Sequence, residues 1–254
     1  MRIVIKVGTS TLAHATGKLN IKRTGELCKT VSDLKNAGHE VVLVSSGAIG
    51  MGVGKLGLAT KPTDIPTKQA AAAVGQCELM YTYDRLFTEF NHTVAQILLT
   101  GADFTAEDRH TNFNNTITRL LQLGALPVIN ENDTIATDEI KVGDNDTLSA
   151  LVAVSIKADV LIILSDVNGL YSADPHTDQN AELIHEVHGV NEETLRLGGG
   201  AGSSLGTGGM KTKLTSAKLC NENGVDMVIA NGDNPDILYT IVNAEKGEYT
   251  RFFA

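Results

Sequence analysis

The sequence has no tryptophan, and its 254 residues include only three cysteines, five prolines and 4% aromatic residues. Cys28, Cys77 and Cys220 lie far apart and form no CxxC or Cys/His cluster, which argues against a disulfide framework or a zinc site and favours free thiols in a reducing cytosol. No stretch approaches the roughly 20 apolar residues of a membrane span. The apolar run at the N-terminus is too short for a signal peptide. We therefore expect a cytoplasmic protein with an aliphatic core.

Basic residues are also fewer than acidic residues. Lys and Arg number 21 against 30 Asp and Glu, a formal net charge of −9. This balance argues against general binding of nucleic acids or anionic membranes, although a few lysines can still gather around one phosphate group. The Walker A pattern GxxxxGK[ST] is absent, which excludes the P-loop kinases. Residues 52–57 match GxGxxG, but no strand directly precedes them and no acidic partner follows, so a dinucleotide site is disfavoured.

Short apolar runs alternate with longer helical patterns. The runs have the length of strands, and most are apolar throughout, as in strands buried on both faces. They span residues 3–7, 41–44, 94–99, 126–129, 160–164 and 227–230. Helices are predicted over residues 24–37, 67–90, 112–123, 147–156 and 211–223, with Gly38 and Gly224 as C-terminal caps. This order predicts an α/β fold with an open, mainly parallel sheet between helices. We expect one domain over residues 1–254, with lobes of about 1–156 and 157–254.

Two of the predicted strands end in small polar residues. Lys6 ends the first strand in KVGTST, where its ammonium group and the backbone amides around Gly8 could meet an oxyanion at the carboxyl edge of the sheet. Ser46 and Gly47 follow the next strand in SSGA. The alternative interpretations are a lysine that extends to solvent at a strand end and an ordinary turn.

Polar residues also lead into the fourth predicted helix. The segment INENDT, residues 129–134, leaves a strand, and KVGDNDTLSA, residues 141–150, runs into a helix whose N-terminus attracts anions. Asp146 or Thr147 could simply cap that helix. Three consecutive polar residues at 144–146 exceed what one cap requires, so this segment is a candidate binding site.

The last helix is preceded by a glycine-rich stretch, residues 198–209, which we interpret as a mobile loop. The segment TGGMKTK, residues 207–213, brings amides, two hydroxyl groups and two lysines to the start of the helix. This composition is typical of a phosphate-binding cradle. Its alternative is a flexible loop followed by a helix start. Ser165 and Asp166 open the segment SDVNGLY, which suits the edge of a nucleotide pocket but would by itself be only a turn.

Taken in this order, the segments KVGTS, SSGA, INENDT, GDND, DxxGLYxxDP and GTGGMKTK resemble the amino acid kinase family. The resemblance covers essentially the whole chain. Within the family, the chain is most similar to the members that phosphorylate the side-chain carboxylate of L-glutamate for proline synthesis. It implies an open, mainly parallel sheet of about eight strands between helices. It also implies that the amino acid binds over the N-terminal lobe and ATP over the C-terminal lobe.

The resemblance assigns roles to residues one by one. Lys6 is similar to the lysine that touches the transferred phosphate, Lys213 to its counterpart on the ATP side, and Asp146 to the acid that orients both. The glutamate-binding positions are Ser46, Gly47, Asp133 and Asn145. The ATP-binding positions are Lys6, Gly8, Ser165, Asp166, Thr207, Gly208, Gly209, Met210, Lys211, Thr212 and Lys213. Mg²⁺ is expected on the ATP phosphates, without metal ligands from the protein.

The resemblance also implies feedback inhibition by proline and assembly into a dimer or tetramer. Many bacterial members carry a further C-terminal domain that resembles RNA-modification modules, and this chain ends at Ala254, so we expect the form without it. Three alternatives remain open: a kinase of the same fold for aspartate or N-acetylglutamate, a non-catalytic nucleotide sensor, and, least favoured, a dehydrogenase. A sensor would be expected to lose Lys6, Lys213 or Asp146, and all three are present.

Overall fold

The computed structural model describes residues 1–14, 18–135, 145–175, 177–178, 180–198 and 209–254. Its centre is an eight-stranded sheet with the order β3-β4-β2-β1-β5-β9-β10-β8. The β9–β10 pair is antiparallel and the other pairs are parallel. The strands are β3 (Val94–Leu99), β4 (Leu126–Glu131), β2 (Glu40–Ser45), β1 (Arg2–Val7), β5 (Val160–Ser165), β9 (Asp226–Asn231), β10 (Tyr249–Phe253) and β8 (Glu186–His188). The predicted α/β class and mainly parallel sheet are confirmed.

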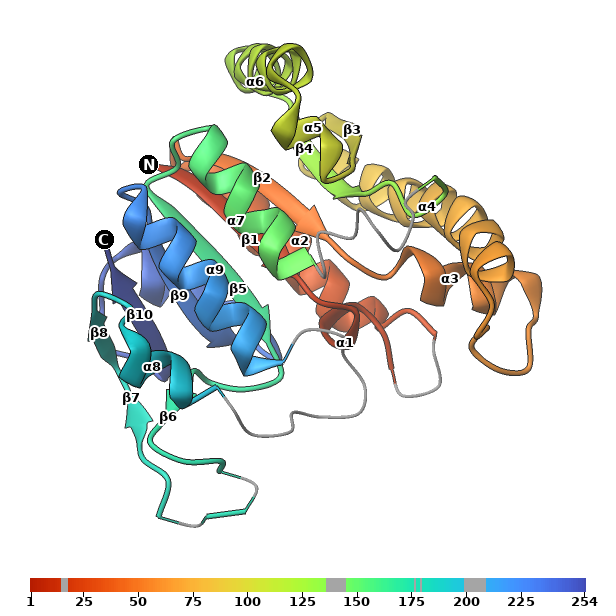
Figure 1. Ribbon diagram of the computed structural model, residues 1–254. Helices are drawn as coiled ribbons and strands as arrows, with labels where there is room; N and C mark the ends of the chain where they lie inside the picture. The colour runs from red at the N-terminus through yellow and green to blue at the C-terminus, as the bar shows by residue number, and fades with distance from the viewer. Residues whose placement is uncertain (15–17, 136–144, 176, 179, 199–208) are drawn as a thin grey trace.

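Helices cover both faces of this sheet (Figure 1). One face packs against α6 (Glu107–Gln122), α7 (Asn145–Ser155) and α9 (Met210–Glu222). The other packs against α2 (Ile21–Asn36), α4 (Ile65–Thr88) and α10 (Ile237–Val242). The remaining elements are α1 (Thr9–Leu12), α3 (Ala48–Leu56), α5 (Ala102–Thr105), α8 (Glu192–Arg196) and the antiparallel pair β6 (Leu170–Tyr171) and β7 (Leu183–Ile184).

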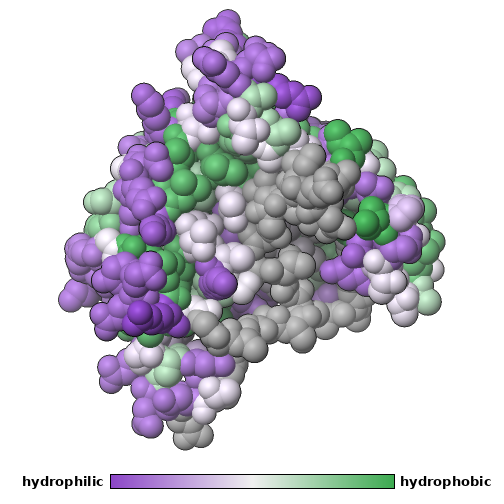
Figure 2. Space-filling model, in the orientation of Figure 1, coloured by the Kyte–Doolittle hydropathy of each residue, from purple (hydrophilic) through white to green (hydrophobic). Residues whose placement is uncertain are grey.

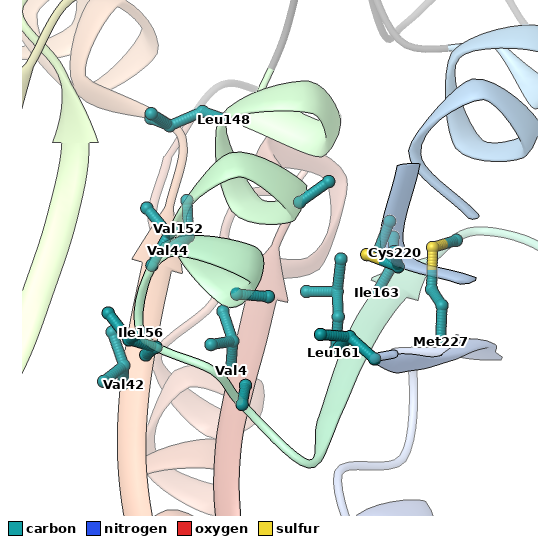
Figure 3. Close-up of a cluster of buried hydrophobic side chains, with 14 of the residues drawn as sticks. Val4, Val42, Val44, Leu148, Val152, Ile156, Leu161, Ile163, Cys220 and Met227 are labelled. Carbon is teal, nitrogen blue, oxygen red and sulfur yellow. The ribbon is translucent and has the colours of Figure 1, made fainter. Parts of the chain in front are cut away.

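The strands bury side chains on both faces, which explains their unbroken apolar runs. In β1, Ile3 and Ile5 belong to the core beneath α2 and α4, while Val4 belongs to the core beneath α7 and α9. Figure 3 shows the second of these cores, where side chains of β1, β2 and β5 meet those of α7 and α9. Because side chains alternate along a strand, Lys6 lies on the same face as Val4, the face of α7 and α9.

The glycine-rich segment after β2 forms a helix that was not among those predicted from the sequence. It forms α3, and Gly57 ends it in the left-handed conformation, with φ +66°. The glycines allow α3 to approach α4 closely: a Cβ on Gly52 would lie 1.8 Å from the carbonyl oxygen of Ala71, and one on Gly75 would lie 1.7 Å from that of Ala48. The GxGxxG match thus falls within a packed helix, which removes its resemblance to a dinucleotide-binding turn.

Two predicted helix ends are confirmed at glycine. Gly38 follows α2 with φ +94° and Gly224 follows α9 with φ +74°, conformations that other residues rarely adopt.

Hydrophilic residues predominate on the outer surface of α6 and around α8 (Figure 2). Among the residues that the structure describes, no helix is both long enough and apolar enough to cross a membrane.

Candidate active site

The candidate site lies where four neighbouring parallel strands end. Strands β4, β2, β1 and β5 are adjacent, so their carboxyl ends form one edge of the sheet. From β1 the chain continues to β2 on one side, and β5 pairs with β1 on the other side. Ligands of open α/β sheets bind at such a switch point. Lys6 lies in β1 next to this edge, and α7 begins at Asn145 beside it.

Asp146 joins two lysines from distant parts of the chain. Lys6 Nζ lies 2.6 Å from Asp146 Oδ1, and Lys213 Nζ lies 3.0 Å from Asp146 Oδ2. The Asp146 side chain is 0% exposed, and those of Lys6 and Lys213 are 11% and 6% exposed. Asp146 lies in the first turn of α7, one residue inside the helix. Its two charged partners give it more than the role of a helix cap.

The electrostatics of this cluster favour an anion. Burial by itself would raise the pKa of Asp146, but the charges of Lys6 and Lys213, with their hydrogen bonds, outweigh burial and hold that pKa below its ordinary value. Asp146 is therefore ionised at neutral pH. Two lysines and one carboxylate leave one net positive charge, to which the N-terminal amides of α7 and α9 add partial positive charge.

Gly8 lies beside the Lys6 ammonium group. Its backbone is extended, with φ −78° and ψ 162°, a conformation open to any residue. A Cβ on Gly8 would lie 3.7 Å from Lys6 Nζ. The lack of a side chain thus leaves room next to the ammonium group rather than relieving the backbone. A phosphate oxygen could approach through that space.

A second polar cluster adjoins the first, because Asn145 directly precedes Asp146. Asn145 Nδ2 lies 2.7 Å from Ser46 Oγ, 3.1 Å from the carbonyl oxygen of Ser45 and 2.9 Å from Asn130 Oδ1. The backbone N–H of Ser46 donates to the carbonyl oxygen of Val7 at 3.0 Å, which holds the ends of β1 and β2 together.

Two residues of this second cluster were not singled out from the sequence. Asn130 is 2% exposed at the end of β4, and its Nδ2 donates to Oε1 of Gln76 on α4 at 2.9 Å. Asn130 does belong to the INENDT segment, so the segment carried a signal for it. Gln76 follows a run of alanines in a helical pattern, where nothing in the sequence distinguishes it from other polar residues.

The other predicted amino-acid positions lie around this cluster. Gly47 separates Ser46 from α3 with φ +106°, a left-handed conformation that explains the glycine. Asp133 lies in the turn after β4 and is partly buried. The structure therefore places Ser46, Gly47 and Asn145 together at one strand edge, with Asp133 two residues beyond the end of β4.

The other predicted nucleotide positions lie at the C-terminal end of β5 and at the N-terminal end of α9. Ser165 is buried at the end of β5, and its Oγ donates to Asp166 Oδ1 at 3.1 Å. In α9, Lys211 is exposed whereas Lys213 is buried, since residues two apart point to opposite sides of a helix. Of these two lysines of α9, it is Lys213 that contacts Asp146.

Of the predicted nucleotide positions 207–213, the structure describes residues 209–213. Gly209 is the N-terminal cap residue, and Thr212 Oγ1 donates to its carbonyl oxygen at 2.8 Å. Met210 is partly buried. Thr207 and Gly208 lie outside the described residues, as do positions 141–144 and most of the segment interpreted as a mobile loop.

Within the described part of the chain, no group of three or more His, Cys, Asp or Glu side chains is placed to hold a metal ion. Both carboxylate oxygens of Asp146 are engaged by lysines.

Comparison with known proteins agrees with the geometry. The model of the Amino acid kinase family matches residues 1–231. The chain belongs to the amino acid kinase family. Relatives include the glutamate 5-kinases of Clostridium perfringens, 52% identical over 96% of this chain and 92% of the relative, and Clostridium acetobutylicum, 53% identical over 96% and 91%. The glutamate 5-kinase of Caldanaerobacter subterraneus is 50% identical, and the match covers 97% of this chain but 66% of that relative.

Solved structures share the amino acid kinase fold at much lower identity. The carbamate kinase from Giardia lamblia bound to AMP-PNP has a TM-score of 0.71 and 16% identity, over 99% of this chain and 98% of that chain. The UMP kinase from Ureaplasma parvum has a TM-score of 0.67 and 15% identity, over 100% and 98%. At these identities the likeness shows the fold alone.

Proposed function

We propose that this amino acid kinase transfers the γ-phosphoryl group of ATP to the side-chain carboxylate of L-glutamate. The products are L-glutamyl 5-phosphate and ADP, the first step of proline biosynthesis. The observation that carries the proposal is the buried bridge from Lys6 through Asp146 to Lys213. The names of relatives about half identical over nearly the whole chain support glutamate as the acceptor.

The chemistry needs charge stabilisation more than proton transfer. A carboxylate is already a nucleophile at neutral pH, so the reaction requires no general base. Two anions must nevertheless approach each other, and preorganised cations lower the cost of the charge that develops on the moving phosphoryl group. Lys6 and Lys213 supply these cations from two sides. Asp146, whose pKa is held low, stays ionised and holds both ammonium groups in place.

The amino acid would bind over the N-terminal lobe, beside Asn145. Asn145 and Ser46 supply an amide and a hydroxyl group that are already oriented by hydrogen bonds. We assign Asp133 to the α-ammonium group of the substrate as a charge-assisted pair. Because Asn145 and Asp146 are consecutive in α7, the acceptor carboxylate would lie next to the lysines that stabilise the phosphoryl group during its transfer.

ATP would bind over the C-terminal lobe, at the start of α9 and the end of β5. The amides at Gly209 and Met210 and the hydroxyl group of Ser165 border this region. Mg²⁺ would be held through the ATP phosphates. Proline would inhibit by competing at or near the amino-acid subsite.

The test is ADP production from ATP, Mg²⁺ and L-glutamate, with and without hydroxylamine. An acyl phosphate reacts with hydroxylamine to give a hydroxamate, so the proposal predicts hydroxamate in step with ADP. N-Acetyl-L-glutamate and L-aspartate serve as alternative acceptors. ADP that forms at the same rate without any amino acid, or hydroxamate that forms only with one of the other acceptors, would refute the proposal.

A further inference from the structure

The amide groups between α4 and α7 form a chain with a defined direction. The backbone N–H of Glu131 donates to Asn130 Oδ1 at 2.9 Å. A backbone N–H can only donate, so the accepting atom of Asn130 must be its oxygen and the opposite atom must be its NH₂ group. That NH₂ group donates to Gln76, which must therefore present Oε1. The backbone thus sets the orientation of both carboxamides.

The same donor-to-acceptor order extends to Asn145, the residue proposed to bind the substrate. Asn130 Oδ1 also lies 2.9 Å from Asn145 Nδ2, so Asn145 turns its NH₂ group toward Asn130, Ser46 and the end of β2. Its Oδ1 is consequently directed away from these acceptors. An oxygen so oriented can accept a hydrogen bond from an ammonium group.

Gln76 is held at this position by the packing of α3 against α4. Gly75 precedes it, and the missing side chain of Gly75 lets α4 approach the carbonyl oxygen of Ala48. Ala48 lies two residues after Ser46. The contact between the two helices therefore ties Gln76 to the strand end that carries Ser46.

Packing alone does not account for a glutamine at position 76. The residue is 6% exposed, and among the residues that the structure describes its Nε2 has no hydrogen-bond partner. A buried donor without a partner destabilises a protein, and an apolar side chain of similar shape would avoid that cost. The hydrogen bond from Oε1 to Asn130 is the contribution that an apolar residue could not make.

We propose that Gln76 is a positioning residue of the amino-acid subsite: it holds the carboxamide of Asn130, and through it that of Asn145, so that Asn145 Oδ1 faces the ammonium group of the amino acid. This inference rests on the proposed function. Gln76 acts on the substrate only through its neighbours. Loss of its acceptor oxygen leaves the buried Asn130 NH₂ group without this hydrogen bond, so the Asn130 carboxamide is held less firmly and Asn145 with it.

The test replaces Gln76 by Met, which keeps the length and removes the acceptor, and by Leu, so that the result does not depend on how one side chain packs. Each variant is expected to raise the KM for L-glutamate by about 10- to 100-fold, the effect of leaving a buried polar group unpaired. The KM for ATP is expected to stay within about twofold. The melting temperature is expected to change by less than about 4 °C, since one unpaired donor replaces another. Cys77→Ser, an exposed neighbour on α4, is the control and leaves both KM values unchanged.

A double-mutant cycle tests whether Gln76 acts through Asn130. In an Asn130→Ala background, Gln76→Met is expected to change the KM for glutamate by less than about threefold, because the residue that transmits its effect is gone. The same fold-increase in both backgrounds would overturn the inference, as would an unchanged KM for glutamate with a lower melting temperature. Wild-type enzyme is assayed first. If it forms no hydroxamate from glutamate, the proposed function fails and the inference with it. If it does, unchanged Gln76 variants overturn the inference alone.

Discussion

Asp146→Asn is the substitution that probes the candidate site most sharply. It keeps the shape of the side chain and removes its charge. The amide oxygen can still accept from one lysine, but the NH₂ group then faces the other ammonium group, donor against donor. Neither lysine then receives a counter-charge from position 146. The chemical change is confined to the centre of the Lys6–Asp146–Lys213 bridge.

The size of the effect follows from the contacts. At an effective dielectric constant of about 20, ion pairs of 2.6 and 3.0 Å each attract by about 6 kcal/mol before desolvation is counted. Breaking a buried pair by removing one partner typically costs about 3–5 kcal/mol of folding free energy. We expect a loss in this range, so the view of this carboxylate as a simple cap, worth about 1 kcal/mol, underestimates it. Activity should fall as well, with kcat reduced by about 10²–10³.

The pH dependence has a defined sign. The folded-state pKa of Asp146 is lowered, so its contribution to stability is present above the unfolded-state pKa, about 3.9. It is lost as the pH falls through the lower, folded-state pKa. The difference in unfolding free energy between wild type and Asp146→Asn should therefore be constant near neutral pH and should shrink below about pH 4.

Denaturant unfolding and steady-state kinetics together provide the assay. The control is Asp226→Asn, the same chemical change in a partly buried pair with Arg251 at the opposite end of the sheet. It should cost at most about 1–2 kcal/mol, between an exposed and a buried pair, and leave kcat unchanged. Two results would contradict this role of Asp146: an Asp146→Asn variant that retains more than about a third of kcat, or a stability difference from wild type that does not depend on pH.

Three further predictions concern the two lysines, the glycines of α4 and α2, and inhibition by proline. Lys6→Ala and Lys213→Ala should each lower kcat by about 10²–10³ with smaller changes in the KM for glutamate; a loss under threefold would remove that residue from the mechanism. Gly75→Ala should lower the free energy of unfolding by about 1–3 kcal/mol or more, because its Cβ would overlap the backbone of α3. Gly25→Ala, in the second turn of α2 where nothing lies within 4 Å of the added Cβ, should instead raise it by about 0.5–1 kcal/mol, and chemical denaturation compares the two. Proline should raise the apparent KM for glutamate without changing kcat, and noncompetitive inhibition would contradict an overlapping site.

Much of the fold could be predicted because the central strands are buried on both faces. Their continuous apolar runs marked six of the eight strands to within two residues. The missed strand β10 carries Thr250 and Arg251 among its aromatic residues, and β8 has three residues, so neither shows such a run. Helix α3 was missed because its glycines are poor helix formers. Close packing on α4 outweighs that local preference.

The candidate site, too, could be predicted from the sequence only in part. Lys6, Asp146 and Lys213 could be named because each lies in a segment with several polar residues at a strand or helix end. Their direct contact could not be read from positions so far apart in the sequence. Gln76 could not be found at all, since only the crossing of α4 over the end of β4 gives that residue its partner.

The most direct test of the central claim is the choice of acceptor by the wild-type enzyme. Steady-state kinetics with L-glutamate, N-acetyl-L-glutamate and L-aspartate should give a kcat/KM for glutamate at least about 10³ above that for N-acetylglutamate, because acetylation removes the positive charge that we assign to Asp133 and adds bulk beside it. Aspartate should also be poor, since one missing methylene displaces its carboxylate from Lys6, and a misplacement near 1 Å can cost about 10². Turnover of N-acetylglutamate within tenfold of glutamate would contradict the account.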